Sequence, residues 1–369
     1  MRQLVPLVLL VVLTMTVNAQ IQKSPSNRVN SEDDYEYSEA ARRTRTIDEE
    51  LKKGMAFYKA NDYKAAADAF SIVANLDPTS FVAQHDLGVA LLQLGDYSAA
   101  VKDFRNAVAI NDRSALTWHF LGFTLHNLNE PDEALKSYLH ALELDKTMTV
   151  TWNNIGEVYV EKENFNAAAD AFNQAQALDP NSIESMNGLC LVYARLGQSA
   201  QAVTACSKAR AVKDSMSSTY YLAWSYLDLK KYPEAISLLK DCVRLDPKKP
   251  NLYVALAEGY YRMNRLNEAL SYAQTATQVS PRSETGYLSM GYILFAMKKP
   301  QDAKRVFEEA LAVDPNSTSA RFNLAMSCLA MKQPDCAREQ YAILKTVEPG
   351  LSTQLLDYIY SSKVLRLVK

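Results

Sequence analysis

The sequence predicts an all-α protein, a solenoid of antiparallel helix pairs, and three observations support this. An alanine recurs at a fixed interval, beginning at Ala66 and Ala100, which are 34 residues apart. A second column of small residues lies twelve positions before the alanines, as at Gly54 and Gly88. Apolar residues around both columns recur at steps of three and four, the period of an amphipathic helix. A sequence period of this length indicates stacked helical repeats.

The alanine column defines nine units. Its members are Ala66, Ala100, Ala134, Ala168, Ala202, Ala235, Ala269, Ala303 and Ala337. Every step is 34 residues except the step to Ala235, which is 33 because one residue is missing near 213–215. Four places after most of these alanines stands a large side chain, with Cys206 and Ala273 as small exceptions. Small residues let two helix backbones approach closely, and large ones fill the gap to the next pair.

Turn signals divide each unit into two helices. Asn61-Asp62 and Gly95-Asp96 are examples, and Pro131 stands just inside a second helix. A proline is favourable there because its missing N–H would have had no partner in the first turn. The prolines that close units are Pro78, Pro180, Pro247, Pro281, Pro315 and Pro349. The nine helix pairs are expected to occupy residues 47–351.

Both ends of the chain differ from the repeats. Residues 1–19 combine a basic residue, an apolar run and a small-x-small site, the layout of a secretory signal peptide. A retained membrane anchor is the alternative, although the apolar run is short for a bilayer span of about 20 residues. Residues 20–46 are polar and are expected to form a flexible spacer leading into the first helix. Residues 352–369 have an apolar stripe and are expected to form a helix that caps the last repeat.

Two segments carry a family resemblance. They read WHFLGFTL from Trp118 to Leu125 and WNNIGEVY from Trp152 to Tyr159, each followed by the alanine and aromatic columns. This pattern resembles the tetratricopeptide repeat, and the resemblance covers residues 47–351. It implies a right-handed superhelix in which the first helix of each pair lines a concave groove and the second faces outward. It also implies that the partner is a protein or peptide.

The predicted groove residues are aromatic, histidine and polar side chains that flank the packing positions of the first helices. They are His119, Phe120, Phe123, His126, Asn154, Glu157, Tyr220, Tyr221, Trp224, Tyr261, Tyr292 and Phe295. Exposed aromatic rings are frequent anchors for a bound partner. The alternative is that these rings pack against the next repeat.

Composition and motifs argue against catalysis, metal binding and nucleic-acid binding. Lys and Arg total 40 and Asp and Glu total 42, so no basic bias indicates nucleic acid. Only four histidines are present, and none belongs to a motif of zinc spacing. No phosphate loop, dinucleotide fingerprint or nucleophile elbow occurs. We therefore expect no enzyme activity, no cofactor, no metal and no small-molecule substrate.

Five cysteines are present, and export would permit disulfides between them. Cys328 and Cys336 flank one helix–helix turn, so a local bridge between them is possible. Cys190, Cys206 and Cys242 fall in packing columns, where a thiol serves as a small hydrophobe. The odd count leaves at least one free thiol or an intermolecular bond.

The sequence as a whole indicates a non-catalytic scaffold or adaptor that acts outside the cytoplasm and holds a polypeptide in its groove. One alternative is a structural or assembly subunit of a cell-envelope or secretion complex. Another is an accessory to an enzyme complex. The expected location is exported (periplasmic, secreted or cell envelope), or membrane-anchored if residues 1–19 are retained.

Overall fold

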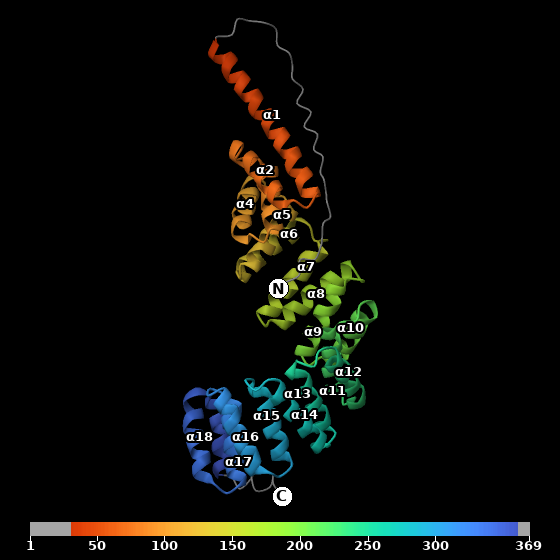
Figure 1. The fold of residues 1–369 in the computed structure, drawn as a ribbon, viewed down its shortest axis with the longest axis vertical. Helices are drawn as coiled ribbons and strands as arrows, with labels where there is room; N and C mark the ends of the chain where they lie inside the picture. Colours follow the sequence, from red (N-terminus) through yellow and green to blue (C-terminus); the bar gives the residue numbers. More distant parts are fainter. Residues whose placement is uncertain (1–30, 361–369) are drawn as a thin grey trace.

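The structure is a computed structural model that describes residues 31–360, and within that range it contains helices and no strands. The helices pack in chain order as an elongated array (Figure 1). They are α1 (Ser31–Lys59), α2 (Tyr63–Leu76), α3 (Phe81–Gln93), α4 (Tyr97–Ile110), α5 (Ala115–Asn127), α6 (Pro131–Leu144), α7 (Thr149–Glu161), α8 (Phe165–Leu178), α9 (Ile183–Arg195), α10 (Ser199–Val212), α11 (Met216–Asp228), α12 (Tyr232–Leu245), α13 (Pro250–Arg262), α14 (Leu266–Val279), α15 (Glu284–Ala296), α16 (Pro300–Val313), α17 (Thr318–Ala330), α18 (Pro334–Val347) and α19 (Pro349–Tyr360).

The helices form nine pairs, from α1–α2 to α17–α18, which confirms the predicted solenoid of nine repeats. Local sequence explains the helix ends. Asp62 and Asp96 cap second helices by accepting a hydrogen bond from a first-turn N–H. Within each of the nine pairs the turn contains one residue at positive φ, such as Gly95 at 78° or Lys230 at 59°, which reverses the chain after the first helix.

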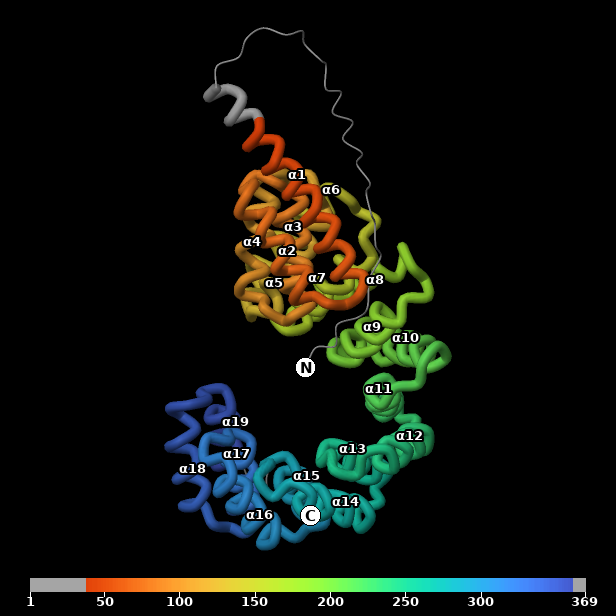
Figure 2. Tube along the Cα trace, turned by 45° about the horizontal axis from the view of Figure 1, so that its top comes forward, coloured from red at the N-terminus to blue at the C-terminus, as the bar shows by residue number. Residues whose placement is uncertain are grey.

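The array curves because the first helices lie closer together than the second helices. Each first helix from α3 to α15 touches the next first helix, and α17 touches α19. No comparable contact joins successive second helices within residues 31–360. Figure 2 shows the resulting arc, which bends around an open centre. The odd-numbered helices therefore lie on the concave side.

One contact recurs inside the repeats and explains two of the sequence columns. The glycine of the first helix faces the aromatic ring of the second, as Gly122 faces Tyr138 and Gly291 faces Phe307. Both rings are buried, with exposed fractions of 0% and 1%. A methyl group on Gly291 would lie 2.5 Å from Phe307 Cε1. Glycine thus leaves room for a buried ring, whereas the ninth repeat, with Ala325 at the same place, has Tyr341 only partly buried.

The ends of the array differ from the sequence-based expectation. The spacer predicted for residues 20–46 is wrong from Ser31 onward, since α1 begins there. The region contains good helix formers, and an i,i+4 ion pair joins Arg45 to Glu49. Arg43 also donates a hydrogen bond to the Leu76 carbonyl at the end of α2. Low hydrophobicity alone was a poor guide to disorder here.

The final described helix, α19, begins at Pro349, three residues before the predicted start. It packs on α17 and α18, and its Leu355 is completely buried. It therefore covers the last repeat, as a solenoid end requires. The predictions for residues 1–19, 20–30 and 361–369 lie outside the described residues. Between residues 31 and 360 no helix combines the length and apolar character needed to cross a bilayer.

Candidate binding groove

The groove is formed by the first helices, which present successive turns to the concave side of the arc (Figure 2). Of the predicted residues, those on α5 and α7 lie in the third and fourth repeats. Those on α11, α13 and α15 lie in the sixth to eighth repeats. The predicted set thus belongs to two separate parts of the groove, with α9 between them.

His119 and His126 do not line the groove, and the prediction for these two residues is wrong. They are 7% and 3% exposed. His119 Nδ1 lies 2.8 Å from Thr151 Oγ1 of the next repeat, and His126 Nε2 lies 3.0 Å from Glu161 Oε2. Burial lowers the pKa of His119 to about 4. Both positions face the neighbouring first helix, so these histidines join repeats together.

His85 occupies the place equivalent to His119, one repeat earlier. Its Nδ1 lies 3.0 Å from Thr117 Oγ1, and burial lowers its pKa to about 4. The same pairing of histidine and threonine therefore joins the second repeat to the third and the third to the fourth. Neutral imidazole suits this buried place, because a charged ring would lose its hydration.

The rings of the third repeat are largely packing residues. Phe120 stacks on Phe104 with centroids 5.7 Å apart, and it is half-buried. Phe123 is also half-buried against the same core cluster. In the fourth repeat, Asn154 is half-buried and Glu157 is exposed. The packing alternative thus accounts for much of Phe120, whereas Glu157 faces solvent.

The rings of the sixth repeat form a contiguous group on α11. Tyr220 contacts Tyr221 and Trp224, with centroids 5.5 and 6.3 Å apart. Tyr220 and Trp224 pack on the core of the sixth and seventh repeats, and Tyr221 packs on that of the fifth. All three rings stay partly exposed. Each ring is therefore held partly by packing and remains partly accessible.

The most exposed predicted rings are Tyr261 and Tyr292, at 39% and 44%. Tyr292 Oη accepts a hydrogen bond of 2.9 Å from Asn323 Nδ2 on α17, and its ring meets Phe307 edge-on at 5.8 Å. These contacts fix its direction before any partner arrives. Phe295, one turn further along α15, is half-buried in the core of the last two repeats.

An ion-pair network next to these rings was not predicted. Arg262 Nη1 lies 3.2 Å from Asp228 Oδ1, and Arg262 Nε lies 2.7 Å from Glu258 Oε1. Arg262 also donates to the Leu227 carbonyl, 3.2 Å away. The network ties α11 to α13, and it places two carboxylates around one guanidinium group.

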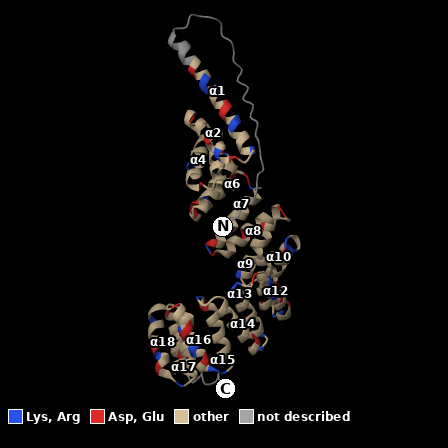
Figure 3. Cartoon of the chain, in the orientation of Figure 1, with Lys and Arg blue, Asp and Glu red and all other residues tan. Residues whose placement is uncertain are grey.

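Asp86 lies on α3, the first helix of the second repeat, where the sequence places it on the groove face. Burial raises the pKa of its carboxyl to about 7. Elsewhere Lys and Arg are interspersed with Asp and Glu along the array (Figure 3).

Two disulfides are present in the described chain. One joins Cys328 to Cys336, the pair for which the sequence allowed a bridge. The other joins Cys190 to Cys206 within the fifth repeat, whereas the sequence reasoning treated both as packing thiols. That expectation is wrong. Cys242 is buried and unbonded.

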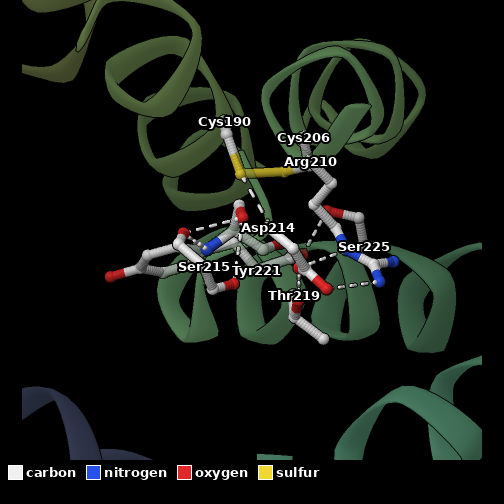
Figure 4. Close-up of a disulfide and its surroundings, with 9 residues drawn as sticks. Cys190, Cys206, Arg210, Asp214, Ser215, Thr219, Tyr221 and Ser225 are labelled. Atoms are coloured by element: carbon white, nitrogen blue, oxygen red, sulfur yellow. Dashed lines mark hydrogen bonds and ion pairs between the residues drawn. A yellow bond between two sulfur atoms is a disulfide. The ribbon is translucent and has the colours of Figure 1, made fainter. Parts of the chain in front are cut away.

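The positions of Cys190 and Cys206 in the sequence columns could have predicted their disulfide. Cys190 stands in the glycine column and Cys206 in the aromatic column, so the disulfide replaces the glycine–ring contact of other repeats. Figure 4 shows the bridge beside α11, where Cys190 Sγ lies 3.9 Å from the Ser218 carbonyl. Asp214 there accepts hydrogen bonds from Arg210 and Thr219, at 3.0 Å each. These contacts order the connection that is one residue shorter than the others.

Among the described residues, no group of three or more His, Cys, Asp or Glu side chains is placed to hold a metal ion. The arrangement offers aromatic rings, carboxylates and amides along a preformed surface. Such groups bind through apolar contact and hydrogen bonding.

Comparison with protein families follows the repeat pattern. Models described as tetratricopeptide repeat match residues 51–115, 115–148, 226–286 and 294–350. A model of subunit 3 of the anaphase-promoting complex, or cyclosome, matches residues 158–242. A comparison with curated protein sequences found no match.

Several solved structures share the fold. In the APC/C hetero-tetramer Cut9–Hcn1, a chain of 17% identity aligns with 81% of this chain and 59% of its own length, with a TM-score of 0.52. PilW, a widely conserved type IV pilus biogenesis factor, is 19% identical over 56% of this chain and 96% of its own, with a TM-score of 0.50. TTC0263, a tetratricopeptide-repeat protein of Thermus thermophilus, is 24% identical over 50% of this chain and 100% of its own, with a TM-score of 0.43.

Proposed function

Because the chain belongs to the tetratricopeptide-repeat family, we propose that it is a non-catalytic scaffold that holds a polypeptide segment in its concave groove. The observation that carries this proposal is the pair of rings Tyr261 and Tyr292, which are 39% and 44% exposed on adjacent first helices. Burying an exposed tyrosine against a partner supplies binding energy at little cost in side-chain freedom.

Rigidity supports the same proposal. Each first helix from α3 to α15 is packed on its own second helix and on both neighbouring repeats. A partner therefore meets a surface that is already ordered, so little conformational entropy is lost on binding. Both Tyr292 and Arg262 are held by neighbours in adjacent repeats.

We also propose that the scaffold acts outside the cytoplasm. The amino-terminal sequence has the layout of a signal peptide, and the two disulfides suit an oxidising compartment. The mature protein is expected to begin at Gln20, and intact-mass measurement before and after reduction should reveal both bridges. A mass that retains residues 1–19 would instead support the membrane-anchored form.

The groove proposal is tested by affinity capture from the source cells, with quantitative mass spectrometry of the bound proteins. The test variant is Tyr261→Ala with Tyr292→Ala. The control is Leu139→Ala with Ile343→Ala, two exposed side chains on second helices, at 44% and 40%. Loss of partners in the groove variant alone supports the proposal. Loss in the control alone would refute it and favour an assembly subunit that binds through its convex face.

A further inference from the structure

The first helices have an unusual charge composition. The eight first helices from α3 to α17 contain seven carboxylates, three arginines and no lysine. The carboxylates are Asp86, Glu157, Glu161, Glu184, Asp228, Glu258 and Glu284. The whole chain, in contrast, is nearly balanced, with a net charge of -2. The first helices from α3 to α17 thus carry an excess of acidic residues.

The acidic groups lie beside the exposed rings. Asp228 follows Trp224 by one turn of α11, and Glu258 precedes Tyr261 by one turn of α13. Asp228 and Glu258 share the single guanidinium of Arg262, which leaves an excess negative charge at that point. Their side chains are 42% and 35% exposed, so a partner can reach them.

The acidic character continues toward the amino-terminal end of the groove. Glu157 and Glu184 are exposed on α7 and α9, and the Glu161 side chain is 41% exposed. Across α7 and α9 the only basic side chain is Arg195, which lies over the Phe165 ring at 4.9 Å. A surface with one sign of charge attracts partners of the opposite sign and repels those of the same sign.

From this composition we propose that the groove binds an extended polypeptide segment in which Lys or Arg alternates with aliphatic residues. The aliphatic side chains pack on Trp224, Tyr261 and Tyr292, and the cationic side chains meet the carboxylates of α7 to α13. This inference rests on the proposed function and adds the chemistry of the partner.

Geometry sets the length of the segment. Packed helices are about 10 Å apart, so the path from α7 to α15 crosses four such steps, about 40 Å. An extended chain advances about 3.3 Å per residue. A segment of about twelve residues therefore spans the acidic and aromatic parts of the groove together.

The test uses the full chain and two blocked twelve-residue peptides labelled with a fluorophore. One alternates lysine with valine and leucine, and the other has glutamate in place of lysine. Fluorescence anisotropy should show binding of the lysine peptide that weakens as salt is raised, and binding of the glutamate peptide that is at least about tenfold weaker. Equal binding of both peptides, or binding of neither, would overturn the inference.

Two double variants test whether the lysine peptide binds in the groove. Glu157→Gln with Glu184→Gln should weaken the lysine peptide about fivefold. Asp170→Asn with Glu339→Gln, on exposed sites of α8 and α18, should leave its binding unchanged. An equal loss in both variants would also overturn the inference. Partner capture that depends on Tyr261 and Tyr292 would still support the groove itself, so the two proposals fail separately.

Discussion

The glycine–ring contact makes a sharp prediction at Gly291. An added methyl group would lie 2.5 Å from Cε1 and 2.6 Å from Cζ of Phe307, whose ring is 1% exposed. Overpacking of a core commonly costs about 1–3 kcal/mol. Alanine in place of glycine stabilises a helix by about 1 kcal/mol. Gly291→Ala is therefore expected to lower the free energy of unfolding by up to about 2 kcal/mol, the steric cost less the helical gain.

The seventh repeat provides the matched control. There the same column holds Ala257, completely buried, and the facing position is Ala273 instead of a ring. Ala257→Gly should destabilise by about 1 kcal/mol, the ordinary cost of glycine in a helix. Glycine is thus expected to be the more stable residue at 291 and alanine the more stable residue at 257, although the two places are equivalent in the repeat.

Urea unfolding followed by circular dichroism measures both variants, and hydrogen exchange of α15 and α16 reports the local effect. Gly291→Ala combined with Phe307→Leu recreates the pairing of Ala223 with Leu239 in the sixth repeat. The pair should lose about 1 kcal/mol less than the sum of the two single losses. A Gly291→Ala variant that is more stable than the wild type would refute the reasoning.

Three further outcomes are expected. Cys206→Ser should lower the free energy of unfolding by about 3 kcal/mol, because the bridge to Cys190 across 16 residues restricts the unfolded chain. Thermal unfolding with and without reductant measures this loss, and an unchanged midpoint would contradict it. Stability should fall as pH drops from about 6.5 to about 4, because burial lowers the pKa of His85 and His119 to about 4 and the unfolded chain takes up protons first. Urea titrations across this range should show that the free energy of unfolding depends less steeply on pH in His119→Asn. Asp86→Asn should raise stability by about 1–3 kcal/mol at pH 8 and by little at pH 4. Burial raises the pKa of the carboxyl from 3.8 to about 7, so the unfolded chain loses this proton first and stability falls as pH rises from about 4 to about 7. Equal effects at both pH values would refute this.

The fold was predictable from sequence because its packing is periodic. Most repeats solve the same problem, the close approach of two helices, with a small residue that faces a large one at the same two places. The nine pairs follow from the alanine and small-residue columns, and their turns follow from signals such as Gly95-Asp96. The first helix was underestimated because its added length rests on helix propensity and ion pairs such as Arg45–Glu49, and not on buried apolar residues.

The groove was harder to predict because exposure depends on how repeats rotate against one another. His119 and Phe123 are four residues apart on one helix, yet the first is buried against the next repeat and the second is half-buried. Helical periodicity places both on one side of α5, but it does not say where the neighbouring helix lies. The disulfide of Cys190 and Cys206 was readable in principle, since the two cysteines fill facing columns.

The position of that disulfide has a mechanical consequence. The Cys190–Cys206 bridge lies in the fifth of nine repeats, with four repeats on either side. When the two ends are pulled apart, each repeat can unfold separately, because helices touch only their close neighbours along the chain. The residues between the two sulfurs cannot be extended while the bridge is intact. Under load the repeats on either side should therefore extend while the segment between Cys190 and Cys206 stays closed. A reductant should allow that segment to extend as well.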